Sequence, residues 1–182
     1  TYLKGHGSFK DKNTLTVKDA SGSTQEIKAK NIVIATGSSV LSLPNIEIDE
    51  SSIVSSTGAL SLKQVPKKLI IIGGGYIGLE MGSVWLRLGS EVEVIEYMDH
   101  IAAGMDREVS DNFLKILKKQ GMKFHLSTKV LDVKKNSSGV TVSVEHNGET
   151  LEMTSDVVLM SVGRKPNTNG LNLEAIGIKK DQ

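Results

Sequence analysis

Three glycines with the spacing G-x-G-x-x-G, Gly73, Gly75 and Gly78, follow an apolar run at residues 69–72 and open a helical pattern. This spacing is typical of turns that hold the diphosphate of a dinucleotide. The first glycine permits the tight turn, the second lets an anion approach the backbone, and the third lets the helix pack closely on the strand. The N–H groups at the start of the helix would then face the anion. A structural turn without a ligand is the alternative interpretation.

A carboxylate, Glu96, ends the next apolar run, about 20 residues after the turn. At the end of a strand it can accept hydrogen bonds from both ribose hydroxyls of an adenosine, each worth roughly 1.5–3 kcal/mol. It would repel a 2′-phosphate by about 4 kcal/mol for charges about 4 Å apart at an effective dielectric constant of about 20. No Arg or Lys among residues 97–99 offsets that repulsion. We therefore predict NAD(H) rather than NADP(H), and the alternative for Glu96 is a solvated carboxylate.

The composition excludes several classes of function. The chain has 182 residues, a formal net charge of +1 and no cysteine. The absence of cysteine excludes disulfides, thiolate nucleophiles and Cys-type zinc sites within the chain. The histidines lie far apart in sequence, so we predict no metal site; they are His6, His100, His125 and His146. The charge predicts no nucleic-acid partner, and the lack of an apolar stretch of about 20 residues predicts no membrane partner.

The first residue is not Met, and the N-terminus shows no signal-peptide pattern. We expect both ends of the chain to continue in a longer protein.

The order of apolar runs and helical patterns predicts an α/β fold. We expect a doubly wound, Rossmann-like parallel sheet with strands at residues 69–72, 92–95 and 123–126. Alternating residues at 130–154 predict a small antiparallel β-meander with a hairpin turn at residues 146–149. A last buried strand is expected at residues 156–160, ending before Gly163.

Two helices are expected between these strands. The first covers residues 76–88 and ends at Gly89, and the second begins after the N-cap Asp106 and runs to Gly121. Each has a predicted buried face, formed in the first helix by Ile77, Met81, Val84, Trp85 and Leu88, and in the second by Val109, Phe113, Ile116 and Leu117.

The N-terminal third of the chain is less regular. Residues 1–37 predict strands and turns, including a short buried strand at residues 32–35 that ends at Gly37. Residues 38–66 lack a clear period and are interpreted as a connection.

Several short motifs occur in one order along the chain. They are A-T-G at 35–37, V-S-S-T-G-A-L at 54–60, the glycine turn to Glu80, G-S-V-W at 82–85, K-Q-G at 119–121 and V-G-R-K-P-N-T at 162–168. With these motifs the chain resembles the flavoprotein disulfide reductases, and among them the dihydrolipoamide dehydrogenases, over nearly all of its length.

The resemblance implies an NAD domain inserted into an FAD domain. Residues 1–38 would be a partial FAD-domain β segment, residues 39–66 a connection and residues 67–166 the NAD-binding domain. Residues 167–182 would begin the return to the FAD domain.

The resemblance also implies site residues. In the FAD segment, Gly7 would lie near the adenine, and Thr36, Gly37 and Ser38 near the flavin nucleotide. In the NAD domain the implied residues are Gly73, Gly74, Gly75, Tyr76, Ile77, Gly78, Leu79, Glu80, Glu96, Val130 on the adenine side and Gly163 on the nicotinamide side.

Three of the implied positions, and Arg164 beside Gly163, also have a structural interpretation. Gly37 could be an ordinary strand-exit glycine, and Tyr76 an exposed turn residue. Glu80 could complement the helix dipole, an effect worth about 0.3–1 kcal/mol. Arg164 fits either a phosphate or interdomain contact or a surface charge.

Members of this family pass electrons between a dithiol, a redox disulfide, FAD and NAD. This sequence contains no cysteine pair, and it lacks the family's first glycine turn for FAD and its His–Glu base pair. We therefore assign no catalytic residue and expect the chain to bind nucleotide without turnover. FAD belongs to the implied parent enzyme, a homodimer and component of 2-oxoacid dehydrogenase complexes in the bacterial cytoplasm or the mitochondrial matrix.

Two alternatives for the function stay open. The chain could be the NAD domain of another disulfide reductase or NADH oxidase, or it could be a non-enzymatic NAD-sensing domain.

Overall fold

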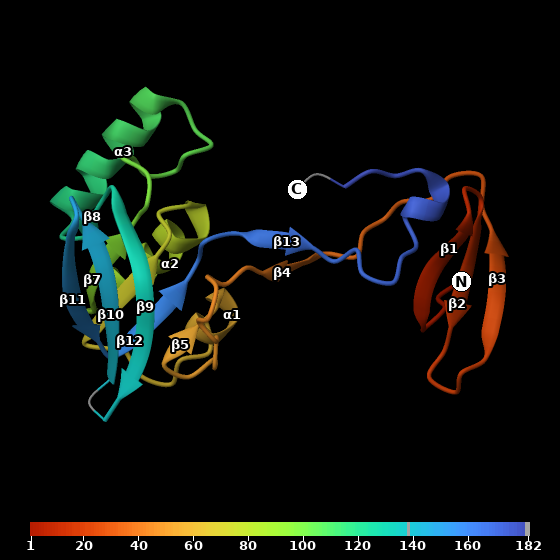
Figure 1. The fold of residues 1–182 in the computed structure, drawn as a ribbon, viewed down its shortest axis with the longest axis horizontal. Coiled ribbons are helices and arrows are strands. Elements are labelled where there is room, and N and C mark those ends of the chain that lie inside the picture. Colours follow the sequence, from red (N-terminus) through yellow and green to blue (C-terminus); the bar gives the residue numbers. More distant parts are fainter. Residues whose placement is uncertain (138, 181–182) are drawn as a thin grey trace. The chain divides into compact units, whose positions relative to one another are not determined.

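The computed structural model describes residues 1–137 and 139–180 (Figure 1). The chain divides into two compact units. One contains Thr1–Ser39 together with the residues from Lys165 onward, and the other contains Val40–Arg164. The larger unit is thus an insertion in the sequence of the smaller one.

A five-stranded parallel sheet forms the centre of the larger unit, in the order β5-β12-β6-β7-β8. Its strands are β5 (Ile53–Val54), β6 (Lys68–Ile72), β7 (Glu91–Ile95), β8 (Lys123–His125) and β12 (Val157–Met160). Strand β6 is a continuous β-branched and Leu run because both of its faces are buried. Leu69 and Ile71 pack on one side of the sheet, and Ile70 and Ile72 pack on the other.

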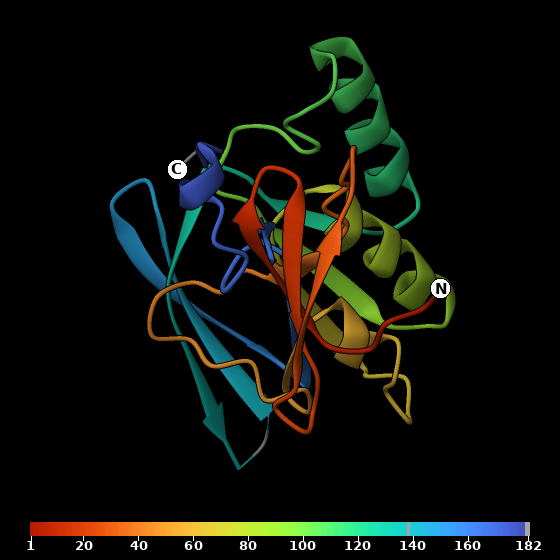
Figure 2. The same ribbon diagram turned by 90° about the vertical axis from the view of Figure 1, so that its right-hand side faces the viewer.

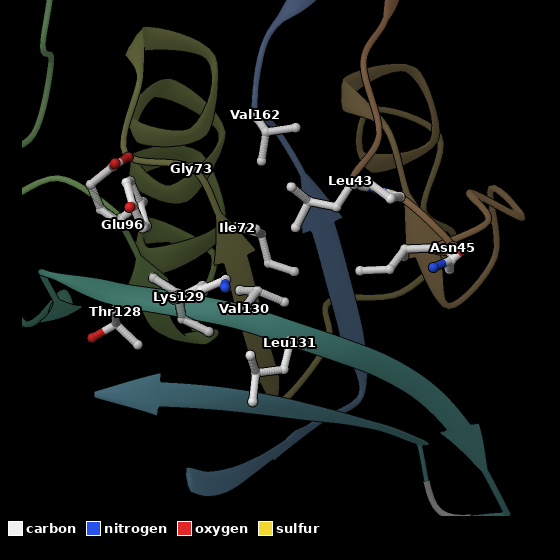
Figure 3. A pocket seen from close by; sticks show the side chains of 14 residues that line it. Leu43, Asn45, Ile72, Gly73, Glu96, Thr128, Lys129, Val130, Leu131 and Val162 are labelled. Carbon is white, nitrogen blue, oxygen red and sulfur yellow. The ribbon is translucent and has the colours of Figure 1, made fainter. Parts of the chain in front are cut away.

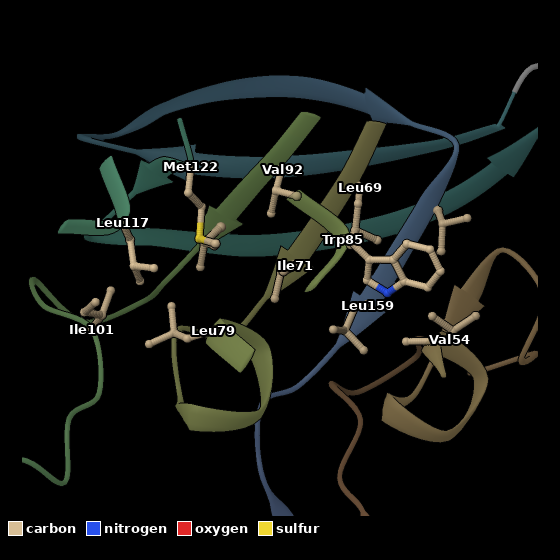
Figure 4. Packing of buried hydrophobic residues seen from close by; sticks show 13 residues of the cluster. Val54, Leu69, Ile71, Leu79, Trp85, Val92, Ile101, Leu117, Met122 and Leu159 are labelled. Carbon is tan, nitrogen blue, oxygen red and sulfur yellow. The ribbon is translucent and has the colours of Figure 1, made fainter. Parts of the chain in front are cut away.

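Helices cover one face of this sheet (Figures 1 and 2). They are α1 (Ser56–Ala59), α2 (Tyr76–Arg87) and α3 (Arg107–Lys119). As predicted, α3 begins after Asp106, whose side chain accepts a hydrogen bond from the backbone N–H of Glu108, and Gly89 follows α2 with a positive φ. The core beneath the helices contains the side chains labelled in Figure 4, among them Leu79, Trp85 and Leu117.

An antiparallel meander covers the opposite face. It consists of β9 (Thr128–Asn136), β10 (Gly139–His146) and β11 (Glu149–Ser155) in the order β11-β10-β9. Alternate residues of β10 (Val140, Val142 and Val144) pack against Ile70 and Ile72. The hairpin turn has positive φ at both central residues, Asn147 and Gly148, as a type I′ turn requires. The predicted parallel sheet with a meander is confirmed, and here the meander takes the face that helices would otherwise cover.

The predicted buried faces of the helices were wrong in part. In α2 the buried residues are Gly78, Leu79, Gly82 and Trp85, whereas Val84 and Leu88 are exposed. The helix can lie close to the sheet there because glycine has no Cβ: a Cβ at Gly82 would lie 2.8 Å from Cδ1 of Ile71.

In α3, Ser110 and Leu117 are buried. Val109, Phe113 and Ile116 lie along the exposed side of the helix. The apolar period located the helix but not the part of its apolar face that reaches the sheet.

Residues 39–66, interpreted as a connection, also contain regular structure. This segment supplies β5 and α1 to the larger unit. Strand β5 extends the parallel sheet, with Ile53 beside Val158 and Val54 beside Leu159. A strand of two residues is too short to produce a period, and its partner β12 lies about 100 residues further along the chain.

The smaller unit contains a three-stranded antiparallel sheet in the order β1-β2-β3. Its strands are β1 (His6–Asp11), β2 (Thr14–Lys18) and β3 (Thr24–Lys28), and a 3-10 helix, η1 (Glu174–Ile176), lies in the C-terminal segment. Phe9 packs with Leu171 and Leu173, and its N–H donates to the carbonyl of Leu171 at 2.9 Å. The chain passes from one unit to the other in two short strands, β4 (Ser38–Val40) and β13 (Arg164–Pro166). These two strands pair with each other.

The predicted buried strand at residues 32–35 was wrong. These residues form no strand, and the exposed fractions of Val33 and Ile34 are 86% and 40%. A strand needs a neighbour for its backbone groups, and none of the described residues pairs with this segment.

Within the described residues, no helix is long and apolar enough to cross a membrane. Among the residues that the structure describes, no three or more His, Cys, Asp or Glu side chains are grouped so that they could hold a metal.

Candidate functional site

Two adjoining cavities open at the carboxyl ends of β6, β7 and β12. Their volumes are about 670 and 390 Å³. From β6 the chain proceeds to β7 and β8 on one side, whereas β12 lies on the other side of β6. Such a reversal in a parallel sheet leaves a crevice at the strand ends, where ligands bind in open α/β folds. Gly73, Glu96 and Val162 line both cavities.

The larger cavity lies between the glycine turn and the meander (Figure 3). Gly73 and Glu96 lie at one end, and Leu43 and Asn45 lie at the other. Strand β9 lines the cavity with Thr128, Lys129, Val130 and Leu131, and Ile46, Ile72, Ile95, Tyr97 and Val162 are among the other lining residues. The cavity therefore has mainly apolar walls with a carboxylate at one end.

The glycine turn has the geometry that its spacing predicts. Gly73 has a φ of +104°, and a Cβ there would lie 2.5 Å from the carbonyl oxygen of Ser161. A Cβ at Gly78 would lie 2.4 Å from the carbonyl oxygen of Gly73, so α2 can approach the turn only with glycine at that position. A Cβ at Gly75 would meet no heavy atom within 4 Å. The first and third glycines are required by packing, and the middle one keeps the backbone accessible.

Helix α2 begins at this accessible point. Its N-cap is Gly75, which has no side chain to accept a hydrogen bond from the first turn, and that turn contains no acidic residue. The N–H groups of the first turn and the positive end of the helix dipole are thus available to an anion.

Glu96 is held at the junction of the two cavities. Its Oε2 accepts a hydrogen bond from the N–H of Gly74 at 2.6 Å, and its Oε1 accepts one from the N–H of Met98 at 2.8 Å. A carboxylate oxygen can accept about two hydrogen bonds. Each oxygen therefore keeps acceptor capacity for a ligand hydroxyl.

A cation lines the same cavity, although the sequence next to Glu96 contains none. Lys129, from β9, lines the larger cavity together with Glu96 (Figure 3). The prediction that nothing offsets the charge of Glu96 considered only residues 97–99 and was incomplete. The signal available in the sequence was the position of Lys129 beside Val130, which the resemblance places on the adenine side.

The smaller cavity follows the glycine turn toward the end of β12. It is lined by Gly73, Gly74, Gly75, Tyr76, Ile77, Glu96, Ala103, Ser161, Val162, Gly163 and Arg164. The hydroxyl of Ser161 donates to the carbonyl oxygens of Ile72 and Gly73, at 2.9 and 3.0 Å, and so fixes the start of the turn. Sequence reasoning missed Ala103, Ser161 and Val162. The last two follow a predicted strand directly, which is the position where parallel sheets present ligand contacts.

Three of the predicted residues, Gly78, Leu79 and Glu80, lie outside both cavities, whereas two others line them. Gly78 and Leu79 are buried beneath the turn, where they pack rather than face the crevice. Glu80 is exposed on α2 and lines neither cavity. Val130 and Gly163 lie in the larger and the smaller cavity, respectively.

The predicted residues of the smaller unit surround a separate cavity of about 380 Å³. Gly7 and Thr36 line it, whereas Gly37 and Ser38 do not. Thr36 donates through Oγ1 to the carbonyl of Asn167 at 2.6 Å, and the N–H of Asn167 donates to the carbonyl of Gly37 at 3.0 Å. The A-T-G and P-N motifs are thus in direct contact.

A buried carboxylate also lies on β7, away from the cavities. Glu93 contacts Lys68 Nζ at 2.8 Å and His125 Nε2 at 2.7 Å. Burial would raise the pKa of Glu93, but the hydrogen bonds and positive charge of Lys68 and His125 outweigh it, and the pKa lies below its ordinary value. Lys68 lies on β6, Glu93 on β7 and His125 on β8, so this group connects the three neighbouring strands. Glu93 lines neither cavity.

The sequence matches one protein family over its whole length. The family model described as "Pyridine nucleotide-disulphide oxidoreductase" matches residues 1–182. The chain belongs to this family.

Its relatives carry the name that the resemblance suggested. The mitochondrial dihydrolipoyl dehydrogenase of Dictyostelium discoideum is 60% identical over 185 residues, which cover 100% of this chain and 38% of the relative. The dihydrolipoamide dehydrogenase of Chaetomium thermophilum is 55% identical over 184 residues, which cover 100% of this chain and 36% of the relative. The chain therefore spans a little more than a third of the length of these members of the pyridine nucleotide-disulphide oxidoreductase family.

A solved structure has the same fold. The HOCl-induced flavoprotein disulfide reductase RclA from Escherichia coli aligns with a TM-score of 0.78 and 31% sequence identity, over 99% of this chain and 40% of that one. The predicted fold class and the predicted family are both confirmed.

Proposed function

We propose that this chain is the NAD(H)-binding part of an enzyme that oxidises dihydrolipoyl groups with NAD⁺ by way of FAD and a redox disulfide. The observation that carries the proposal is the position of Glu96 between two cavities at the end of β7, beside a glycine turn with an open middle position. The names of relatives at 55% and 60% identity support the dihydrolipoyl substrate class.

The residues of the crevice fit a dinucleotide. The adenosine would occupy the larger cavity, with its ribose hydroxyls donating to Glu96 and its adenine beside Val130. The diphosphate would lie at Gly75 and the start of α2, and the nicotinamide half would extend toward Gly163 in the smaller cavity. When bound, NAD⁺ accepts a hydride, and the residues of this chain bind and orient it.

The preference between NAD(H) and NADP(H) depends on two opposite charges. Glu96 accepts from ribose hydroxyls and repels a 2′-phosphate, whereas Lys129 in the same cavity attracts one. We propose that Glu96 dominates, because its carboxylate is fixed by two backbone hydrogen bonds, whereas Lys129 is exposed.

Calorimetric titration of the chain with NADH and NADPH tests the proposal. We expect NADH to bind at least roughly tenfold more tightly, a difference of about 1.4 kcal/mol. Lys129→Met should weaken the binding of NADPH more than the binding of NADH. Equal affinities for the two cofactors would remove the argument for NAD(H), and binding of neither would remove the site.

The remaining features of the parent enzyme are proposals from the family resemblance. FAD would be bound mainly by parts of the enzyme outside this chain, with the segment that contains Gly7, Thr36, Gly37 and Ser38 as one contact. Homodimer formation and membership of a 2-oxoacid dehydrogenase complex follow the same reasoning. We propose the mitochondrial matrix as the location, because the Dictyostelium relative is named mitochondrial.

A further inference from the structure

Gly74, which precedes the accessible Gly75 in the glycine turn, is held on both sides. The N–H of Gly74 donates to Glu96 Oε2 at 2.6 Å, and its carbonyl accepts a hydrogen bond from the N–H of Ala102 at 2.8 Å. Ala102 itself has a positive φ, which alanine seldom adopts. The Gly73–Gly74 peptide unit is therefore oriented by the carboxylate that follows β7, and the Gly74–Gly75 peptide unit by the constrained loop that contains Ala102.

The carboxylate of Glu96 is suited to this role because it only accepts hydrogen bonds. Oε2 receives the N–H of Gly74, and Oε1 receives the N–H of Met98. A glutamine of the same shape would offer one oxygen and one NH₂ group. One of the two backbone N–H groups would then face another donor, so the neutral side chain cannot maintain both contacts.

We propose that Glu96 is a positioning residue for the glycine turn in addition to being a ribose ligand, so that one carboxylate couples recognition of the ribose to recognition of the diphosphate. The inference rests on the proposed NAD(H) site. Glu96 lines the larger cavity, where the ribose would lie, and the peptide it holds lines the smaller cavity beside Gly75. The turn thus has its binding conformation only while the carboxylate is in place.

The test is a cycle that removes the carboxylate and the ribose hydroxyls separately. The chain and its Glu96→Gln variant are titrated with NADH and with an NADH analogue whose adenosine ribose lacks both hydroxyls. If Glu96 acted only through those hydroxyls, the variant would bind the analogue as tightly as the wild type does. We expect the variant to bind the analogue roughly tenfold more weakly, the effect of losing one charge-assisted hydrogen bond.

A matched variant controls for the loss of a carboxylate close to Glu96 in the sequence. Glu91→Gln removes a half-exposed carboxylate at the start of β7 that pairs with Lys123 and lines neither cavity. It should leave the affinity for both ligands unchanged. Amide spectra of both variants show whether the fold is intact and whether the signals of residues 73–75 move in Glu96→Gln alone.

A second variant perturbs the same contact from the other side. A Cβ at Gly74 would lie 3.1 Å from Glu96 Oε2 and 3.3 Å from its Cβ and Cγ, so Gly74→Ala displaces the carboxylate without a positive-φ penalty. The effects of Gly74→Ala and Glu96→Gln on the affinity for the analogue should be less than additive in the double variant.

The outcomes separate the two proposals. A wild-type chain that binds neither NADH nor the analogue overturns the proposed function. A wild-type chain that binds NADH, with a Glu96→Gln variant that binds the analogue at wild-type affinity, overturns only the coupling. Fully additive effects in the double variant overturn it as well.

Discussion

Strand β6 and the segment at residues 32–36 are both short apolar runs that lead into a glycine, yet their environments differ completely. The side chains of residues 69–72 are at most 2% exposed, between helices on one face and the meander on the other. In the second segment Val33 is 86% exposed, and no strand pairs with it within the described residues.

The difference shows that an apolar run becomes a strand only where neighbours satisfy its backbone groups. Strand β6 has β12 on one side and β7 on the other, each paired over four or five residues. The segment at 32–36 instead forms contacts at its end, where Thr36 and Gly37 bond to Asn167. Apolar sequence is therefore common to both segments, and the neighbouring strands decide the outcome.

The largest expected effect comes from truncating the buried run. Ile71 is a fully buried residue of β6 that packs beneath α2. Ile71→Ala should lower the free energy of unfolding by about 2–5 kcal/mol, because it removes buried methyl groups and leaves a cavity. Urea unfolding followed by the fluorescence of Trp85, the single tryptophan, reports on this unit.

The matched change in the exposed segment is Val33→Ala. It should change the free energy of unfolding of its own unit by less than about 0.5 kcal/mol, since surface substitutions seldom do more. Amide hydrogen exchange measures this change. A loss comparable to that of Ile71→Ala would show that residues 32–36 are packed in solution and would break the comparison.

Substitution of the glycine that follows each run should show the same order, with a larger loss of stability after β6 than after residues 32–36. Gly73→Ala should cost roughly 2–4 kcal/mol, because the new Cβ would overlap the carbonyl of Ser161 at a residue whose φ is also positive. At Gly37 the φ is positive as well, but an added Cβ would make only an ordinary van der Waals contact with the side chain of Asn167. Gly37→Ala should therefore cost about 1 kcal/mol, the strain of the backbone alone. Chemical denaturation monitored by residue-resolved NMR compares the two variants, and equal costs would contradict the assignment of Gly73 to a tight turn.

The charged group that joins β6, β7 and β8 gives a pH-dependent effect. The pKa of Glu93 is lowered in the folded state by Lys68 and His125. Its contribution is therefore present above the unfolded pKa of about 4.3 and is lost as the pH falls through the folded value. Glu93→Gln should lower the free energy of unfolding by about 1–3 kcal/mol at about pH 7.

That difference from the wild type should shrink below about pH 4.3. Denaturation curves between about pH 3 and pH 7, on the order of one per pH unit, measure the trend. Glu91→Gln is the control, because its carboxylate is half-exposed. Exposed pairs contribute at most about 1 kcal/mol. A Glu93 effect of constant size at all these pH values would mean that packing, rather than charge, links the strands.

The smallest effect on folding should come from Gly75→Ala. Gly75 has an extended backbone conformation with negative φ, and an added Cβ would meet open space. The free energy of unfolding should therefore change by less than about 0.5 kcal/mol. The affinity for NADH should nevertheless fall, because the methyl group would occupy the approach to the backbone. Unchanged affinity would place the diphosphate elsewhere.

Much of the larger unit could be predicted from the sequence, because its signals are local. The glycine turn, the N-cap Asp106, the Asn147–Gly148 hairpin turn and the β-branched run of β6 each specify a conformation within a few residues. They located four of the five parallel strands, both long helices and the meander.

The errors concern features that depend on distant residues. The exposure of Val84 follows from Gly78 and Gly82 taking the contact face of α2, and the position of Lys129 in the cavity follows from the meander folding over the strand ends. Strand β5 could be recognised only once β12 was known to lie beside it. For the site, the sequence identified Glu96 and the turn, and the three-dimensional arrangement added Ser161, Ala103 and Lys129.

The ends of the larger unit meet at one place, where the N–H of Leu41 donates to the carbonyl of Gly163 at 3.0 Å. A segment whose first and last residues lie side by side can be expressed separately with its ends joined by a short linker. It can also be circularly permuted, with new termini in a surface hairpin. Residues 40–164 therefore meet the geometric requirement for insertion as one domain between two neighbouring strands of another protein.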